Sequence, residues 1–301
     1  MSWQRLGRIF TASGQRDWMM SHASVPYAEH IEADLFRIYF TPRDAQNRSY
    51  LGWLEIELSR PDRILRIAET PLLGPGLPGS FDDCGTMGSW LVTEGGRRHH
   101  YYIGWNIRKP MPFHVSIGRA SENTDGELEK LAGPILDRTP IDPWFCSNPC
   151  VMLENGVWRM WYLSGLGWKN AEATPSASYH VRYAESSDGI NWDRAGMTAI
   201  DLTHPDEIAI ARPAVVRTDD GYLMWYCYRG NSFPYRLGHA RSPDGLAWTR
   251  FDDEAGLSPA ASGWDGSMIA YPFVFDHHGS RYLLYCGDGF GRSGFGLAVE
   301  A

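Results

Sequence analysis

Short apolar runs alternate with turn residues along the chain, and the pattern returns at an interval of about sixty residues. Each copy opens on a proline or glycine, and a tyrosine within an aromatic run follows thirteen residues later. The opening residues are Pro26, Gly88, Pro149, Pro213 and Pro272, and the tyrosines are Tyr39, Tyr101, Tyr162, Tyr226 and Tyr285. Repeats of this length, built from short strands, are typical of a radial all-β array. The pattern predicts a five-bladed β-propeller of four-stranded antiparallel blades, with one domain over residues 1–301.

The third and fourth copies show most clearly how one blade is built. Asn155-Gly156 and Asp220-Gly221 each separate two apolar runs, and such dipeptides favour tight hairpins because they accept a positive φ. A Ser-x-Asp-Gly-x-x-Trp element closes both copies, at 186–192 and 242–248. Its Asp and Gly suit a turn and its Trp suits packing between blades, so we interpret the element as structural.

The last copy supplies only three strands, near residues 273–276, 282–287 and 295–299. A four-stranded blade would then lack one strand and leave a sheet edge exposed. We expect residues 6–10 to add this strand, so that the N-terminal segment completes the last blade and covers its edge.

Composition narrows the class of partner. The formal charge of −8 and the scattered arginines argue against nucleic acid and anionic membranes. No apolar stretch approaches the ~20 residues needed to cross a bilayer, and residues 1–13 lack a signal-peptide core, so we expect a cytoplasmic protein without membrane insertion. Five cysteines without a second cysteine pair fit a reduced core, and we expect neither a metal nor a cofactor. The sequence leaves the oligomeric state open.

Candidate site residues follow from the strand order of a propeller, in which the first strand starts beside the axis and the second returns there. One set precedes each opening residue, and another follows it by fifteen to eighteen residues. The binding candidates are His22, Arg43, Asp44, Trp105, Asn148, Arg212, Arg229, Tyr271, Asp288 and Arg292. Rings together with polar groups suit a carbohydrate or sugar-phosphate ligand. The alternatives are structural: His22 also fits a satisfied core histidine, and Arg212 fits a purely structural arginine. Loop caps are the alternative for four acids near glycines, Asp82, Asp83, Asp265 and Asp288.

The repeated first-strand proline, the Trp-Tyr second strand and the Ser-x-Asp-Gly-x-x-Trp element resemble the five-bladed propeller glycosidases of glycoside hydrolase families 43 and 32. A closer resemblance is to bacterial glycosidase-like proteins of surface-polysaccharide loci and to the N-terminal region of plant glucosamine inositolphosphorylceramide transferases. The stretches that carry this closer resemblance are 39–46, 81–87, 102–106, 209–213 and 264–272. It implies a carbohydrate-active hydrolase or glycosyl-transfer enzyme of polysaccharide metabolism.

The residues at the usual catalytic positions depart from this resemblance. Family 43 places an Asp directly before the first blade's proline and a Glu two residues before a later one, where this chain has Val25 and Ala211. An aliphatic side chain transfers no proton. Because hydrolysis needs one protonated and one ionised carboxylic acid, we expect a relocated pair, with Glu207 as acid and Asp83 or Asp265 as base or nucleophile.

The alternative is a non-catalytic module that binds a sugar, a sugar phosphate or a nucleotide sugar. The candidate arginines favour this reading, because a guanidinium group matches the geometry of phosphate and carboxylate.

Overall fold

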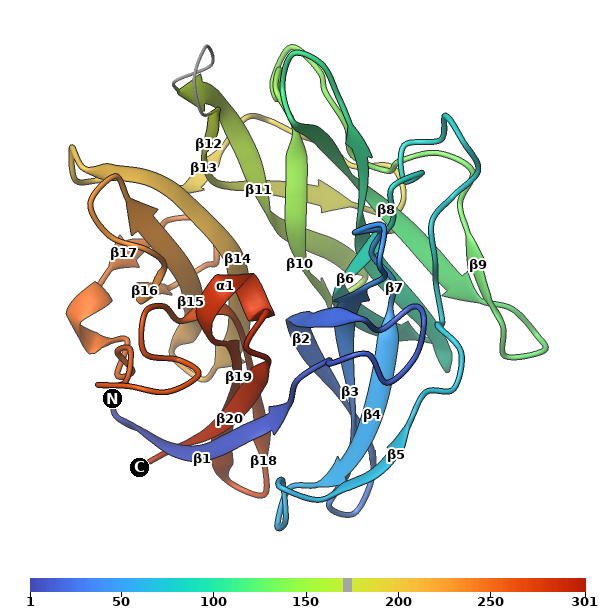
Figure 1. The fold of residues 1–301 in the computed structure, drawn as a ribbon. Helices are drawn as coiled ribbons and strands as arrows, with labels where there is room; N and C mark the ends of the chain where they lie inside the picture. The colour runs from blue at the N-terminus through green and yellow to red at the C-terminus, as the bar shows by residue number, and fades with distance from the viewer. Residues whose placement is uncertain (170–174) are drawn as a thin grey trace. The chain divides into compact units, whose positions relative to one another are not determined.

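Strands make up almost all of the regular structure in the computed structural model, which describes residues 1–169 and 175–301 (Figure 1). The strands form antiparallel meanders of four. The first meander consists of β2 (Ser21–Glu32), β3 (Leu35–Arg43), β4 (Gly52–Glu57) and β5 (Ile64–Ile67). The second consists of β6 (Thr86–Glu94), β7 (Arg97–Ile107), β8 (Phe113–Glu122) and β9 (Leu128–Lys130). The prediction of an all-β fold with four-stranded antiparallel blades is confirmed.

An eight-stranded sheet holds the next two meanders, joined by one parallel bridge between Tyr179 and Ala209. Its first half consists of β10 (Cys146–Glu154), β11 (Val157–Lys169), β12 (Ser176–Ser186) and β13 (Thr198–Ile200). Its second half consists of β14 (Glu207–Thr218), β15 (Gly221–Gly230), β16 (Arg236–Ser242) and β17 (Thr249–Arg250). Two short helical segments follow in the chain, η1 (Asp252–Glu254) and α1 (Asp288–Gly291).

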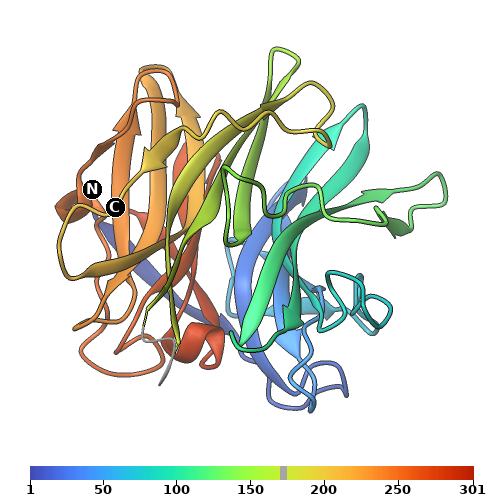
Figure 2. The same cartoon turned by 90° about the horizontal axis from the view of Figure 1, so that it is seen from above.

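The last meander takes its fourth strand from the N-terminal end of the chain. It consists of β18 (Ala270–His277), β19 (Ser280–Cys286), β20 (Phe295–Glu300) and β1 (Trp3–Phe10). The antiparallel pairing of β1 with β20 runs from Trp3 opposite Glu300 to Phe10 opposite Phe295. The two termini lie side by side (Figures 1 and 2), and the Ala301 amide donates to the Ser2 carbonyl at 3.0 Å. The prediction that an N-terminal strand completes the last blade is confirmed.

Contacts group the chain into two compact units, each with its own buried aromatic residues. Unit 1 comprises Met1–Gly74, Ala214–Cys227 and Pro234–Ala301, and unit 2 comprises Pro75–Pro213 and Tyr228–Phe233. In unit 1, Trp3 meets Trp225 edge-on with ring centroids 5.9 Å apart. In unit 2, Trp158 lies 6.3 Å from Tyr101. One domain over residues 1–301 stays a prediction.

In three of the meanders, a tyrosine of the second strand anchors the loop that precedes the first strand. The Tyr162 hydroxyl donates to Asp142 at 3.0 Å and the Tyr285 hydroxyl donates to Asp265 at 3.1 Å, each acid lying twenty residues earlier in the chain. In the second meander Tyr102 makes the same contact with Asp82 at 3.3 Å. Tyr102, and not the predicted Tyr101, is therefore the counterpart of Tyr162 and Tyr285 in the second meander. The two tyrosines are adjacent in sequence, and only the contact with Asp82 distinguishes them.

Each of these buried acids also binds a cation. Arg182 and Arg194 both lie 3.1 Å from the fully buried Asp142 carboxylate, Lys130 lies 2.7 Å from Asp82, and Arg5 lies 2.9 Å from Asp265. A buried carboxylate is tolerated when it is paired and hydrogen-bonded. These contacts therefore fix the loop before a first strand against the second strand of the same meander.

We expect Trp3→Ala to lower the melting temperature strongly. Trp3 is buried, packs on Trp225 and donates its indole N–H to the Ala255 carbonyl at 2.9 Å. Truncation of a buried tryptophan typically costs about 3–5 kcal/mol. Calorimetric melting of Trp3→Ala beside the exposed control Gln4→Ala measures the effect. Equal melting temperatures for the two variants would show that β1 adds nothing to the stability of unit 1.

We also expect Asp142→Asn to destabilise unit 2. Asp142 accepts hydrogen bonds from Tyr162 and Ser164 and pairs with Arg182 and Arg194, so the neutral amide leaves two largely buried cations without a countercharge. Breaking a buried pair costs about 3–5 kcal/mol. Urea unfolding of Asp142→Asn, with the exposed Asp125→Asn as control, measures the loss. A midpoint equal to that of the control contradicts this role.

Candidate functional site

The first strands carry a strained backbone position directly before the repeat prolines. The residues at this position are Val25, Asn148, Arg212 and Tyr271, with φ of 51°, 46°, 56° and 56°. A β-bulge lies at the same place in β2, β6, β10 and β18. Positive φ is rare outside glycine and is a genuine outlier for a β-branched residue such as Val25. Bulges and strain of this kind concentrate at functional sites, so these positions mark candidate site residues within each unit.

Arg212 connects three first strands of unit 2. Its Nη1 atom lies 3.3 Å from the Ser89 hydroxyl on β6, and that hydroxyl donates to the Pro149 carbonyl on β10 at 2.9 Å. The Arg212 side chain is fully buried, and its guanidinium group lies 5.2 Å from the centroid of the Trp90 ring. These contacts link β14 to β6 and β10, so Arg212 helps to hold these first strands together. Its contact with a ligand stays a prediction.

Asn148 and Thr86 bring buried polar atoms to the same strands. Asn148 is 7% exposed and Thr86 is fully buried. Among the residues that the structure describes, neither Asn148 Oδ1 nor Thr86 Oγ1 has a hydrogen-bond partner. Because buried polar atoms are nearly always satisfied, these two atoms are suited to accept hydrogen bonds from a bound molecule.

Two of the three predicted catalytic carboxylates lie in unit 2. Asp83 is partly exposed and accepts hydrogen bonds from the Gly79 amide at 2.9 Å and from Asn106 Nδ2 at 2.7 Å. Burial opposes ionisation of Asp83, but these hydrogen bonds outweigh it and lower the pKa of its carboxyl. Glu207 is buried, and its Oε2 atom accepts the Thr203 amide at 2.9 Å. Asp83 is therefore ionised at neutral pH, and Glu207 closes the loop before β14.

The third predicted carboxylate, Asp265, shares its surroundings with structural acids. It is 3% exposed and bound by Arg5 and Tyr285, the same acid–tyrosine–cation arrangement that surrounds Asp82 and Asp142. This recurrence indicates a structural role for Asp265 and leaves Asp83 as the better candidate base.

The residues at the usual family 43 positions are buried and apolar. Val25 is 0% exposed and Ala211 is 1% exposed. Neither offers a group that can exchange a proton with a substrate. Acid–base chemistry in this chain therefore has to use other residues.

Four further binding candidates of unit 1 gather in one region. They are His22 on β2, Arg43 at the end of β3, Tyr271 on β18 and Arg292 directly after α1. Burial, Arg43 and Arg292 together lower the pKa of His22 to about 4. Burial also lowers the pKa of Arg43. Tyr271 acts to raise this pKa, and Arg292 acts to lower it further. The interactions place one histidine and two arginines within electrostatic range of each other.

The predicted acids Asp44 and Asp288 close loops. Asp44 accepts the amides of Gln46 and Arg48 and pairs with the Arg48 guanidinium at 2.7 Å. Burial opposes ionisation of Asp44, but the bonds from Arg48 outweigh it and lower the pKa of its carboxyl. Asp288 Oδ1 accepts the amides of Ser267 and Met268 at 2.8 and 2.9 Å. These contacts of Asp288 are those of a loop cap, the structural alternative to a binding role.

The two remaining candidates lie in unit 2. Arg229 donates to the Ala177 carbonyl at 3.0 Å, and its guanidinium group lies 5.8 Å from the centroid of the Tyr179 ring. Trp105 is partly buried, and its backbone pairs with Cys84 and Gly85. Their contacts with a ligand stay predictions.

Sequence reasoning missed Phe290, which the structure places in the α1 segment with its side chain 50% exposed. Its ring lies 6.0 Å from that of the buried Tyr235, which in turn lies 6.1 Å from the ring of Tyr271. The signal for it was the run Gly287-Asp-Gly-Phe-Gly291, where one large apolar ring lies among residues that otherwise favour a tight loop.

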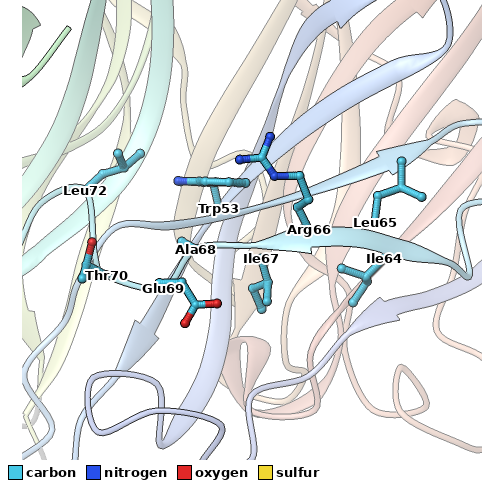
Figure 3. Close-up of a pocket in the computed structure, with 9 residues that line it drawn as sticks. All are labelled: Trp53, Ile64, Leu65, Arg66, Ile67, Ala68, Glu69, Thr70 and Leu72. Carbon is cyan, nitrogen blue, oxygen red and sulfur yellow. The ribbon is translucent and has the colours of Figure 1, made fainter. Parts of the chain in front are cut away.

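A surface groove lies elsewhere in unit 1, along β4 and β5 (Figure 3). The side chains that line it are Trp53, Ile64, Leu65, Arg66, Ile67, Ala68, Glu69, Thr70 and Leu72. Arg37 and Arg66 lie 4.5 and 5.5 Å from the centroid of the Trp53 ring. None of the predicted site residues lines this groove.

Within residues 1–169 and 175–301, no group of three or more His, Cys, Asp or Glu side chains could hold a metal ion. Over the same residues, no helix is both long and apolar enough to span a bilayer.

Several solved structures share this fold over nearly the whole chain. The structure of a BT0996 RGII complex matches with a TM-score of 0.74 at 19% identity, covering 98% of this chain and 90% of that one. A GH130-family structure, from mannoside phosphorylases and glycoside hydrolases that target β-1,2-mannosidic linkages, matches with a TM-score of 0.72 at 16% identity, covering 99% and 93%. A thermostable family-43 glycoside hydrolase matches with a TM-score of 0.65 at 15% identity, covering 93% of this chain and 88% of that one. The chain therefore has the propeller fold found in glycoside hydrolases, and the resemblance to them in fold is confirmed.

Sequence comparison adds relatives over the full length. No family model matches the chain. The uncharacterized proteins MT1551 and Rv1502 of two Mycobacterium tuberculosis strains are each 44% identical over 300 residues, covering 99% of this chain and 99% of theirs. The chain belongs to the family of these two mycobacterial proteins.

We expect His22 to make the protein less stable in acid. Its folded pKa of about 4 lies below the ordinary value of 6.5, so the unfolded chain binds the proton more tightly and stability falls as pH decreases through this window. His22→Gln should therefore lose less melting temperature than wild type between pH 7 and pH 4.5. The exposed control His204→Gln should keep the wild-type pH dependence. Parallel losses in wild type and His22→Gln would contradict this placement of His22.

Proposed function

We propose that the protein binds a carbohydrate and acts on a glycosidic bond, with Glu207 as general acid and Asp83 as base or nucleophile. The observation that carries the proposal is the ionised Asp83, which lies partly exposed in the loop before β6 and is held by Asn106 and the Gly79 amide. Glycoside hydrolysis pairs one ionised carboxylate with one protonated carboxyl group. The buried Glu207 lies in the same unit, and the proposal assigns the protonated role to it.

Three further features support a carbohydrate ligand. The fold is that of glycoside hydrolases, although fold alone does not assign an activity. The strained residue Asn148 and the buried Thr86 present oxygen atoms that can accept hydrogen bonds from hydroxyl groups. The partly buried ring of Trp105 is of the kind on which sugar faces stack.

A second candidate function is binding without catalysis. It is favoured by the buried apolar Val25 and Ala211, which stand where family 43 enzymes carry carboxylates. In this case the protein binds a sugar, a sugar phosphate or a nucleotide sugar without changing it chemically.

Single-residue variants at the two carboxylates test the enzymatic proposal. A panel of oligosaccharides and nitrophenyl glycosides identifies a substrate by the release of reducing sugar or nitrophenol. On that substrate, Asp83→Asn and Glu207→Gln should each lower kcat by at least about 100-fold, the scale of a lost general acid or base. Asp265→Asn should act through stability instead, with a lower melting temperature and a smaller change in kcat.

The outcomes separate the two functions. Full turnover by both Asp83→Asn and Glu207→Gln would overturn the assignment of the pair. Ligand binding by calorimetry without turnover by wild type would favour the binding module. An Asp83→Asn variant that binds the ligand as wild type does but turns over slowly would place Asp83 in the chemical step.

A further inference from the structure

The side chains of His22, Arg43 and Arg292 in unit 1 approach one another where the α1 segment packs on the start of β2. Ser21, beside His22, lies opposite Arg43 in the pairing of β2 with β3. Gly291 packs so closely on β2 that a Cβ atom there would come within 2.9 Å of the Ala23 carbonyl oxygen. Arg292 follows directly in the chain. The backbone therefore brings Arg292 to the same end of β2 as His22 and Arg43.

The α1 segment keeps a strained shape at this point. Gly289 has φ of 66° and Phe290 has φ of 60°, a conformation that an aromatic residue rarely adopts. The Ser24 hydroxyl donates to the Phe290 carbonyl at 2.5 Å and so helps to fix the segment on β2. Strained positions that are held by their surroundings concentrate at ligand sites.

The strained segment presents an aromatic ring to solvent. Phe290 is 50% exposed, and its ring lies in an edge-on arrangement against the buried Tyr235. Tyr271, whose ring adjoins Tyr235, interacts electrostatically with Arg43. The exposed ring and the cations thus belong to one connected set of side chains. An apolar surface with a few fixed polar groups is the usual composition of a small-molecule site.

The charge at this position is positive. The two charged groups that lower the pKa of His22 are both arginines, and Arg292 also lowers the pKa of Arg43. The neighbouring acids are engaged elsewhere: Asp44 pairs with Arg48, and Asp288 Oδ1 accepts two backbone amides. Like charges held together cost free energy, which a bound anion offsets. Two guanidinium groups suit the oxygen atoms of a carboxylate or a phosphate.

We propose that His22, Arg43 and Arg292 bind the anionic substituent, a carboxylate or a phosphate, of a carbohydrate whose ring packs on Phe290. This inference rests on the proposed carbohydrate-binding function and specifies its ligand class as an acidic sugar. Arg292 and Arg43 determine the preference for the charge, and Phe290 contributes to the binding of any sugar ring.

Titration calorimetry with matched sugars tests the proposal. The probes are glucose, galactose and mannose, their acidic counterparts glucuronate, galacturonate, glucose 6-phosphate and mannose 6-phosphate, and inorganic phosphate. At least one acidic sugar should bind ten-fold or more tightly than its neutral counterpart, and added salt should weaken this preference. Uronates and sugar phosphates, compared with each other, distinguish a carboxylate from a phosphate as the preferred anion.

Variants separate the charge from the ring. Arg292 is exposed, so Arg292→Gln should fold normally and lose ten-fold or more in affinity for the acidic sugar with no change for the neutral one. Arg43→Gln should show the same selective loss, and Phe290→Ala should weaken both ligands. The exposed Arg63→Gln, on the connection between β4 and β5, is the matched control and should bind as wild type does.

The results also separate this inference from the function on which it rests. Equal affinity for neutral and acidic sugars, unchanged in Arg292→Gln, would overturn the inference and leave the proposed carbohydrate binding intact. Inorganic phosphate that binds as tightly as the sugar phosphates would overturn the role of Phe290. Binding of none of these sugars by wild type would contradict both proposals.

Discussion

The buried carboxylate that meets a repeat tyrosine is the contact on which the rest of this structure depends. Asp82, Asp142 and Asp265 lie in the loops before first strands, and their tyrosines lie in the second strands. A buried carboxylate is costly unless paired and hydrogen-bonded, so each loop has one low-energy position. That position sets where the following first strand begins. The bulge and the residues around it are therefore placed by a contact between the protein's own side chains.

The strained position before the repeat proline carries a side chain with a different role in each repeat. Val25 is buried and apolar, Arg212 cross-links strands, and Asn148 keeps an oxygen atom that can accept a hydrogen bond. A backbone conformation that costs free energy in several repeats and carries unlike side chains is a property of the architecture. The chemistry of each repeat then depends on which side chain occupies the position.

The two units carry different chemistry. Unit 2 holds the ionised Asp83 and the buried Glu207, which suit proton transfer. Unit 1 holds His22, Arg43 and Arg292 beside an exposed ring, which suits recognition of an anion. Similarity to glycoside hydrolases accounts for the scaffold of both units, whereas each function follows from its own residues.

The sequence by itself determined the strand pattern, because alternation, hairpin dipeptides and a long repeat are local properties of the chain. The sequence also predicted that an N-terminal strand, β1, completes the last meander, because the exposed edge of a three-stranded sheet needs a partner. Only the tertiary structure decided what each polar residue contacts. Asp83 and Asp265 both lie in glycine-containing loops before a first strand, yet Asp265 is buried against Arg5, which lies 260 residues away in the chain. Hydrogen bonds and burial between distant segments are not local, and they separate a structural acid from a candidate catalytic one.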